Sequence, residues 1–256
     1  LIRNKNRPTA KDYIENIFTD FYEMHGDRLY GDDQAILGGV ARLDSMPVTV
    51  IAQIKGHDLE ENKKTNFSMP HPEGYRKALR LAKQAEKFHR PVICLIDTPG
   101  AFCGVEAEER GQGEAIAKNL AEFMTLRTPV ISVVLGEGGS GGALALGVCD
   151  SLGMLENALY SVISPRGAAS ILWKDASKEQ EACNVLKITA QDLYNFGVAD
   201  AVIEEPNGAA HNDLYKMSEN IKEFLLDNVT KNLQKDIDVL LDFRYNKFRK
   251  IGMFQE

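Results

Sequence analysis

Hydrophobic positions along the chain fall into alternating blocks that predict an α/β architecture. Two apolar runs without alternation, 91–97 ("PVICLID") and 129–135 ("PVISVVL"), have the pattern of fully buried strands. Each follows a segment with helical spacing of its apolar residues, 74–88 and 114–127 respectively. Both strands open with proline and end in a glycine loop. This repeated pattern indicates a strand-and-helix unit that occurs twice in one fold rather than a solenoid.

The flanking segments predict further elements. A helix behind a Thr9 cap is expected over 9–27, with Ile14, Ile17, Phe18 and Phe21 on one face. The β-rich runs 35–44 and 47–55 predict a hairpin. Downstream we expect a strand at 158–163 and short helices at 166–173 and 178–187. Residues 193–205 predict a helix, a turn at Gly197 and a strand. Two amphipathic helices are expected within 213–250.

Composition limits what this architecture can belong to. At 256 residues and 44% hydrophobic, the chain can bury the core of one domain, 1–256, with a helical tail at about 213–250. Its four cysteines lie far apart, which argues against a metal site or a disulfide frame and favours a reduced, cytoplasmic protein. No stretch reads as a membrane span or signal peptide. A net charge of −7 disfavours nucleic-acid binding.

The stretch "GEGGSGGALALG", 136–147, carries the strongest chemical signal. It spells a dinucleotide-binding fingerprint, but the acids Asp150 and Glu156 follow too soon to hold a ribose. Nearby "DTPG", 97–100, is typical of a GTPase metal motif, yet the chain has no phosphate loop to accompany it. Both nucleotide interpretations are therefore disfavoured.

The same stretch also has the strand, turn and helix context of a nucleophile elbow centred on Ser140. In the chain order of that family its base would be His211, the only downstream histidine, which lies in a polar segment. No second triad signal is present. We therefore favour a Ser140 that is small for the same reason as its glycine neighbours, with a serine hydrolase as the alternative function.

A backbone oxyanion hole is the third interpretation. A helix that begins at Gly141 to Ala143 has unpaired N–H groups in its first turn, where they stabilise negative charge. Without side chains, a planar carbonyl can reach these donors as its oxygen becomes charged. Close helix packing also selects small residues and remains the structural alternative.

Four blocks in the same order carry a resemblance to a known family: "NFSMPHPEGYRKALRLAKQAEKF", "IDTPGAFCGVEAEERGQGEAIAKNL", "GEGGSGGALALG" and "SVISPRGAASILWKD". They resemble the α subunits of the bacterial acetyl-coenzyme A carboxylase carboxyltransferase family, within the crotonase superfamily. The resemblance implies a crotonase-like α/β fold of repeated ββα units with helical N- and C-terminal elements. It also implies carboxyl transfer from carboxybiotin to acetyl-coenzyme A, which gives malonyl-coenzyme A in the first committed step of fatty-acid synthesis.

The resemblance further implies partners and cofactors. Biotin would arrive on the biotin carboxyl carrier protein after carboxylation by biotin carboxylase in the ATP-dependent complex, and this chain would bind no cofactor of its own. A β subunit, carrying a four-cysteine zinc ribbon, would complete an α₂β₂ heterotetramer. Membrane and nucleic-acid partners are not expected.

Site residues follow from matching the family motifs to this chain. The backbone N–H groups of Gly142 and Ala143 would hold the biotin ureido oxygen as the catalytic oxyanion hole. The other substrate-binding positions implied are Gly138, Gly139, Gly141, Thr98, Gly100, Ala101, Phe102 and Gly167.

Two departures from the family accompany the resemblance. Family members usually have glutamate in "SPEG", where this chain has Arg166. Some relatives also carry a longer helical N-terminal extension, so we expect this chain to be a short or trimmed form.

Overall fold

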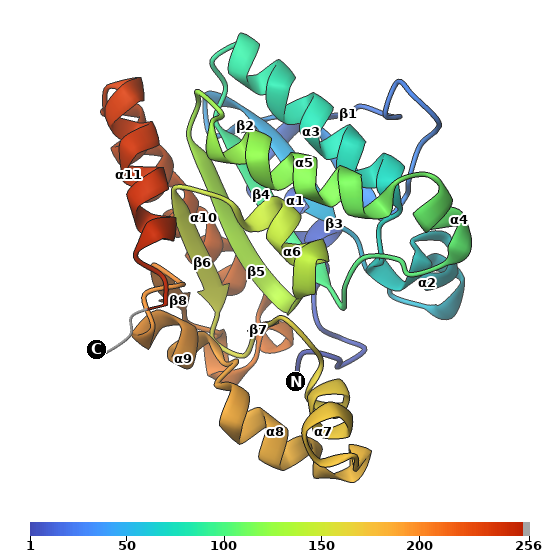
Figure 1. The fold of residues 1–256 in the computed structure, drawn as a ribbon. Coiled ribbons are helices and arrows are strands. Elements are labelled where there is room, and N and C mark those ends of the chain that lie inside the picture. The colour runs from blue at the N-terminus through green and yellow to red at the C-terminus, as the bar shows by residue number, and fades with distance from the viewer. Residues whose placement is uncertain (253–256) are drawn as a thin grey trace.

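One mostly parallel β-sheet, covered by helices on both faces, organises the chain (Figure 1). The computed structural model describes residues 1–252. Within them, the strand order is β1-β2-β3-β4-β5-β6-β8, and β7 pairs with the end of β5. The strands are β1 (Thr19–Glu23), β2 (Ile36–Leu43), β3 (Met46–Gln53), β4 (Val92–Thr98), β5 (Val130–Gly139), β6 (Ser151–Leu155), β7 (Leu159–Ser161) and β8 (Ala201–Ile203).

Helices connect the strands and form the tail of the chain. They are α1 (Ala10–Ile17), α2 (Leu59–Lys64), α3 (Pro72–Lys87), α4 (Val105–Glu109), α5 (Gln112–Met124), α6 (Ser140–Gly147), α7 (Pro165–Trp173), α8 (Glu179–Leu186), α9 (Ala190–Asn195), α10 (Leu214–Leu233) and α11 (Ile237–Arg249). The predicted hairpin is confirmed as β2 and β3, and the two predicted tail helices are confirmed as α10 and α11.

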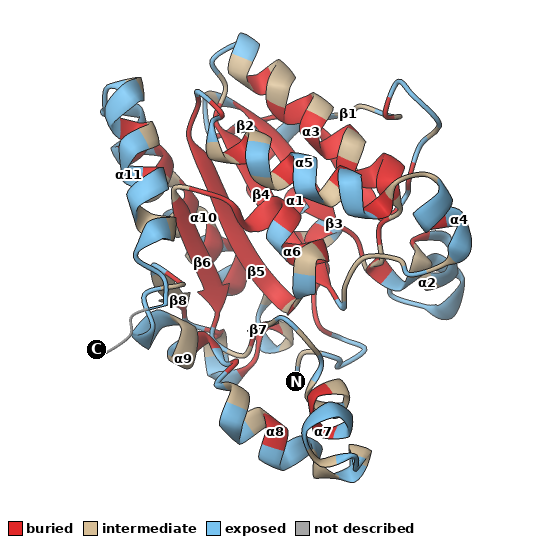
Figure 2. Cartoon of the chain, in the orientation of Figure 1, coloured by how far each residue is buried: buried red, intermediate tan, exposed pale blue. Residues whose placement is uncertain are grey.

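The two apolar runs form the centre of the sheet. β4 and β5 pair in parallel, with Val92 opposite Val130 and Ile96 opposite Val134. Every residue of β4 is buried, as a strand with helices on both faces requires (Figure 2). The sheet is parallel from β3 to β8, whereas β1, β2 and β3 pair antiparallel.

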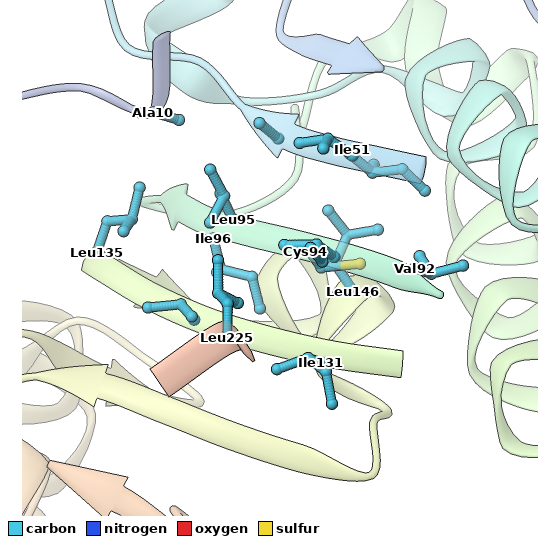
Figure 3. Packing of buried hydrophobic residues seen from close by; sticks show 14 of the residues in the cluster. Ala10, Ile51, Val92, Cys94, Leu95, Ile96, Ile131, Leu135, Leu146 and Leu225 are labelled. Atoms are coloured by element: carbon cyan, nitrogen blue, oxygen red, sulfur yellow. The ribbon is translucent and has the colours of Figure 1, made fainter. Parts of the chain in front are cut away.

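Helices on the two faces enclose one large apolar core. α3, α5 and α6 cover one face, and α1 and α10 cover the other (Figure 1). Figure 3 shows strand residues such as Leu95 and Ile131 packed together with Leu146 of α6 and Leu225 of α10. α7 and α8 project beyond the body of the sheet (Figure 1). No helix within residues 1–252 is long and apolar enough to cross a membrane.

The first predicted helix is correct at its start and wrong at its end. Thr9 caps α1 through a capping box with Asp12, but the helix ends at Ile17 and the following residues form β1. Phe21 therefore packs against the core from a strand rather than from a helix. Pairing with β2 satisfies backbone groups that a helix extended to residue 27 would have used internally.

The sequence prediction also missed β6 and overextended its neighbour. All five residues of "SLGML", which form β6, are buried, so this strand lacks the alternation that marks a half-buried strand. The strand predicted over 158–163 is the shorter β7. β7 is short because it pairs only with the glycine-rich end of β5, where Gly138 lies opposite Tyr160.

Candidate active site

The glycine stretch lies at the carboxyl end of β5 and continues into α6. Ligands in open parallel sheets bind outside this edge. β4 ends at the same edge and leads into the loop 99–101, so the two glycine-containing segments that the sequence analysis singled out lie next to each other.

Close packing between these segments explains why Gly139 and Gly142 lack side chains. A Cβ on Gly142 would lie 2.5 Å from the Ala101 nitrogen and 2.9 Å from the Tyr75 hydroxyl. A Cβ on Gly139 would collide with the Pro99 carbonyl. At these two positions the loop 99–101 occupies the space that a side chain would need, which agrees with close packing as the reason for glycine. Gly141 differs, because a Cβ there would make only an ordinary 3.5 Å contact with Ile116.

The first turn of α6 presents backbone donors without protein acceptors. Among residues 1–252, no side chain or loop carbonyl accepts the N–H of Gly141 or Gly142, which stand too early in α6 to bond along the helix. The Ala101 N–H, beside Gly142, is likewise without an acceptor there. Ala143 is the fourth residue of α6, where bonding along the helix begins. Gln53 donates a buried 2.8 Å hydrogen bond to the Gly142 carbonyl, which orients that part of the turn. Two segments thus bring unpaired donors together where the helix dipole favours negative charge.

Two cavities flank the glycine turn, and Ser140 borders both. The first, which we call the arginine cavity, has a volume of about 510 Å³ and includes Arg3, Gly138, Gly139, Arg166 and Glu179 in its lining. The second, the apolar cavity, has a volume of about 470 Å³ and includes Gly141, Leu144, Tyr160, Phe248 and Ile251. The remaining predicted site residues line neither cavity; these are Gly142, Ala143, Thr98, Gly100, Ala101, Phe102 and Gly167.

The predicted residues of the 98–102 segment hold the loop in place. Thr98 is buried, and its hydroxyl lies 2.5 Å from the Ser68 carbonyl oxygen and accepts the Gly100 N–H at 3.0 Å. Phe102 stacks on His71 with ring centroids 4.2 Å apart. Substrate contact by Thr98, Gly100 and Phe102 stays a prediction, and their observed contacts are with the protein itself.

Gly167 and Arg166 belong to the first turn of α7, across the arginine cavity from the glycine turn. The Ser164 hydroxyl caps this helix by accepting the Gly167 N–H at 3.1 Å. Arg166 is exposed and lines the cavity, as does Arg3 from the N-terminal segment. The departure from the family pattern thus lies on a wall of this cavity.

Ser140 has the backbone strain of a nucleophile elbow but no base beside it. Its φ of +52° is in the left-handed region, which a serine rarely adopts. His211 lies within 3.5 Å of the Asn4 side chain and lines neither of the cavities that Ser140 borders. Residues 1–252 therefore do not assemble the Ser140 and His211 pair that the hydrolase alternative requires.

Sequence reasoning missed a charged cluster at the same edge. Lys55 follows β3, and its Nζ lies 2.5 Å from Asp97 Oδ1 and 2.9 Å from Glu137 Oε2. Arg3 also donates to Glu137, at 2.7 Å. Burial by itself raises the pKa of Glu137, but Arg3 and Lys55 outweigh it and lower that pKa. Asp97 was singled out only as part of "DTPG", and Lys55 had no signal because the strand pairing that brings it there is long-range.

Comparison with known proteins places this geometry in a family. Residues 1–252 match the model of the acetyl co-enzyme A carboxylase carboxyltransferase-like family. A Clostridium perfringens relative, acetyl-coenzyme A carboxylase carboxyl transferase subunit alpha, is 60% identical over 98% of this chain and 93% of its own length.

Solved structures share the fold at lower identity. The transcarboxylase 12S core has a TM-score of 0.68 at 22% identity, over 88% of this chain and 43% of that chain. A Pseudomonas malonate decarboxylase hetero-tetramer in complex with coenzyme A has a TM-score of 0.68 at 18% identity, over 86% of this chain and 89% of that chain. The predicted crotonase-like fold is confirmed by these neighbours.

Proposed function

Since the chain belongs to the acetyl-coenzyme A carboxylase carboxyltransferase family and is an α-type subunit of that enzyme, we propose that it provides the biotin side of a divided active site. The full reaction moves the carboxyl group of carboxybiotin, carried on the biotin carboxyl carrier protein, to acetyl-coenzyme A and yields malonyl-coenzyme A. The unpaired backbone donors of Gly142 and Ala101 carry this proposal, and we include the neighbouring Ala143 N–H in the proposed oxyanion hole.

These donors fit a biotin ureido group. Its oxygen is a planar carbonyl acceptor, and N–H groups at a helix start suit an oxygen on which negative charge develops. When bound, carboxybiotin would supply the carboxyl group, and once its nitrogen–carboxyl bond has broken, the freed ring nitrogen could take the proton of the acetyl methyl. The chain then has to bind and orient the ureido oxygen and stabilise its charge, without a side-chain base. Ser140 has no part in these steps.

The missing second donor set supports a β-subunit partner. Carboxyl transfer develops charge on the ureido oxygen and on the thioester oxygen, whereas the described residues 1–252 offer one glycine-rich donor turn. A β subunit with a zinc ribbon would supply the second set. We expect an α₂β₂ enzyme in the cytoplasm, supplied with carboxybiotin by biotin carboxylase. Closed two-fold assemblies are the commonest oligomers, and a malonate decarboxylase of this fold is itself a hetero-tetramer.

The donor assignment is tested by Gly142→Val in the assembled enzyme. The added side chain would press on the Ala101 nitrogen and displace donors on both segments. We expect kcat to fall by about 10²- to 10³-fold, the usual cost of losing an oxyanion donor.

Gly113→Val is the matched control, because a Cβ on that exposed α5 glycine meets nothing within 4 Å. Circular dichroism and co-purification with the β subunit verify that both variants fold and assemble. A folded, assembled Gly142→Val enzyme with the kcat of the Gly113→Val control would refute the assignment.

A further inference from the structure

Three neighbouring strands are joined at the active-site edge by one ammonium group. Lys55 follows β3, Asp97 lies in β4 and Glu137 lies in β5. The Lys55 Nζ contacts both carboxylates, at 2.5 Å and 2.9 Å. β3, β4 and β5 are consecutive in the sheet. The Lys55 contact therefore links the carboxyl ends of β4 and β5 to each other and to the end of β3.

Asp97 also fills an irregularity between the two central strands. The register of β4 and β5 shifts after Ile96, so that Thr98 lies opposite Gly138. At this shift Asp97 Oδ1 accepts the Glu137 N–H at 2.8 Å. A Cβ on Gly136 would lie 2.8 Å from the same oxygen, so glycine is needed there to admit the carboxylate.

The cluster is largely shielded from water, so its charge balance affects its geometry. The side chains of Asp97, Glu137 and Lys55 are 5%, 15% and 20% exposed. Burial by itself lowers the pKa of Lys55, but Asp97 and Glu137 outweigh it and raise that pKa. Without the ammonium, Arg3 alone would balance the two nearby carboxylates, and the excess negative charge would push them apart in a poorly hydrated space. The other ionisable groups around the cluster include Arg3, Lys5, Arg7, Asp12, Tyr13, His57 and Glu179.

The two segments that carry the oxyanion donors of this chain extend from the strand ends that the cluster ties together. The loop with Ala101 follows Asp97, and the turn with Gly142 follows Glu137. Their separation therefore depends on how closely the ends of β4 and β5 are held. We propose that Lys55 is a positioning residue that sets the distance between the two donor segments through Asp97 and Glu137. This inference rests on the proposed function of those donors.

Lys55→Met in the assembled enzyme tests the inference, because methionine keeps most of the side-chain volume and removes the charge. We expect kcat to fall by about 10- to 100-fold, as for a small misplacement of reacting groups, with KM for the coenzyme A substrate unchanged. The activity of this variant should rise as the pH is lowered, because protonating one carboxylate removes the repulsion. Wild type should show no such rise.

A double variant gives a second readout in the same assay. Glu137→Gln removes one of the two negative charges, so Lys55→Met/Glu137→Gln should recover at least several-fold of the lost kcat. Lys83→Met is the matched control, since Lys83 also bridges two carboxylates, Glu86 and Glu122, on helices away from the site. It should keep wild-type kcat and pH profile.

The outcomes separate this inference from the proposed function. If Gly142→Val is inactive while Lys55→Met has wild-type kcat and pH profile, the positioning role is overturned and the donor assignment stands. A fall in kcat without acid recovery and without rescue in the double variant would also overturn it, because Lys55 would then be a structural group only. Full activity of Gly142→Val would overturn the donor assignment itself.

Discussion

At the scale of single residues, different glycine positions of this chain exclude a side chain for different structural reasons. Gly142 and Gly139 are bare because loop 99–101 packs against them, and Gly136 is bare to admit the Asp97 carboxylate. The sequence predicted that side chains are excluded from this stretch. It could not decide whether close packing of the protein or access of a substrate carbonyl is the reason. That distinction depends on which distant loop lies nearby.

Ser140 provides a prediction that separates small size from nucleophilicity. Ser140→Ala removes the hydroxyl, and Ser140→Gly also suits the left-handed backbone at this position. We expect both variants to keep carboxyl transfer within about tenfold, because a non-nucleophilic hydroxyl contributes at most a modest hydrogen bond.

Labelling tests the hydrolase alternative independently of turnover. A fluorophosphonate probe should leave Ser140 of the wild-type protein unmodified. Labelling at Ser140, or complete loss of activity in a folded Ser140→Ala protein, would favour the hydrolase.

Asp32 gives a pH-dependent prediction for stability. Burial by itself raises its pKa, but the hydrogen bonds from Lys77 and the Gly26 N–H outweigh it and lower that pKa to about 2. A lowered folded-state pKa stabilises the protein above the unfolded-state value, and this contribution is lost as the pH falls toward the folded-state value. Stability should therefore decline between about pH 4 and pH 2.

Chemical denaturation across that range provides the measurement. Asp32→Asn should be less stable at neutral pH, because Lys77 is fully buried and loses its carboxylate partner. Its stability should also decline less steeply than that of wild type between pH 4 and pH 2. Parallel curves for the two proteins would contradict the assignment.

At the scale of elements, local patterns predicted those parts whose own residues decide their structure. The β2–β3 hairpin, the buried strands β4 and β5, and the tail helices follow from spacing and composition. The end of α1 and the strand β6 could not be predicted, because pairing with distant strands decides both.

α11 shows how one buried side chain docks a whole helix. Arg244 is 1% exposed and donates to Asp150 and to the carbonyls of Phe123, Leu126 and Thr128. The Phe123 carbonyl lies in the last turn of α5 and the Leu126 carbonyl follows the helix, and a cation is favourable at a helix C-terminus. The guanidinium thus joins α11 to α5 and to the start of β6.

Arg244→Met should therefore destabilise the fold by about 3–5 kcal/mol, as expected when a buried ion pair loses one partner. Arg127→Met is the control, since its pair with Asp238 of α11 has side chains 51% and 75% exposed. That change should cost at most about 1 kcal/mol. Urea unfolding measures both, and equal losses would contradict the docking role of Arg244.

At the scale of the whole molecule, the sheet brings the segments of the proposed site together at one edge. The sequence predicted the glycine turn, the helix start and the 98–102 segment separately. The Ala101 donor beside Gly142 and the Lys55 cluster emerge only from the order β3-β4-β5. The sites are thus predicted as segments, while their mutual geometry is a property of the assembled sheet.

The most direct test of the divided-site account is malonyl-coenzyme A-dependent carboxylation of biocytin. It is measured for the isolated chain, for the isolated β subunit and for their mixture at equal protein concentration. We predict activity only in the mixture, in a complex that contains both subunits, because each supplies one set of oxyanion donors. Substantial turnover by the isolated α chain would contradict the account.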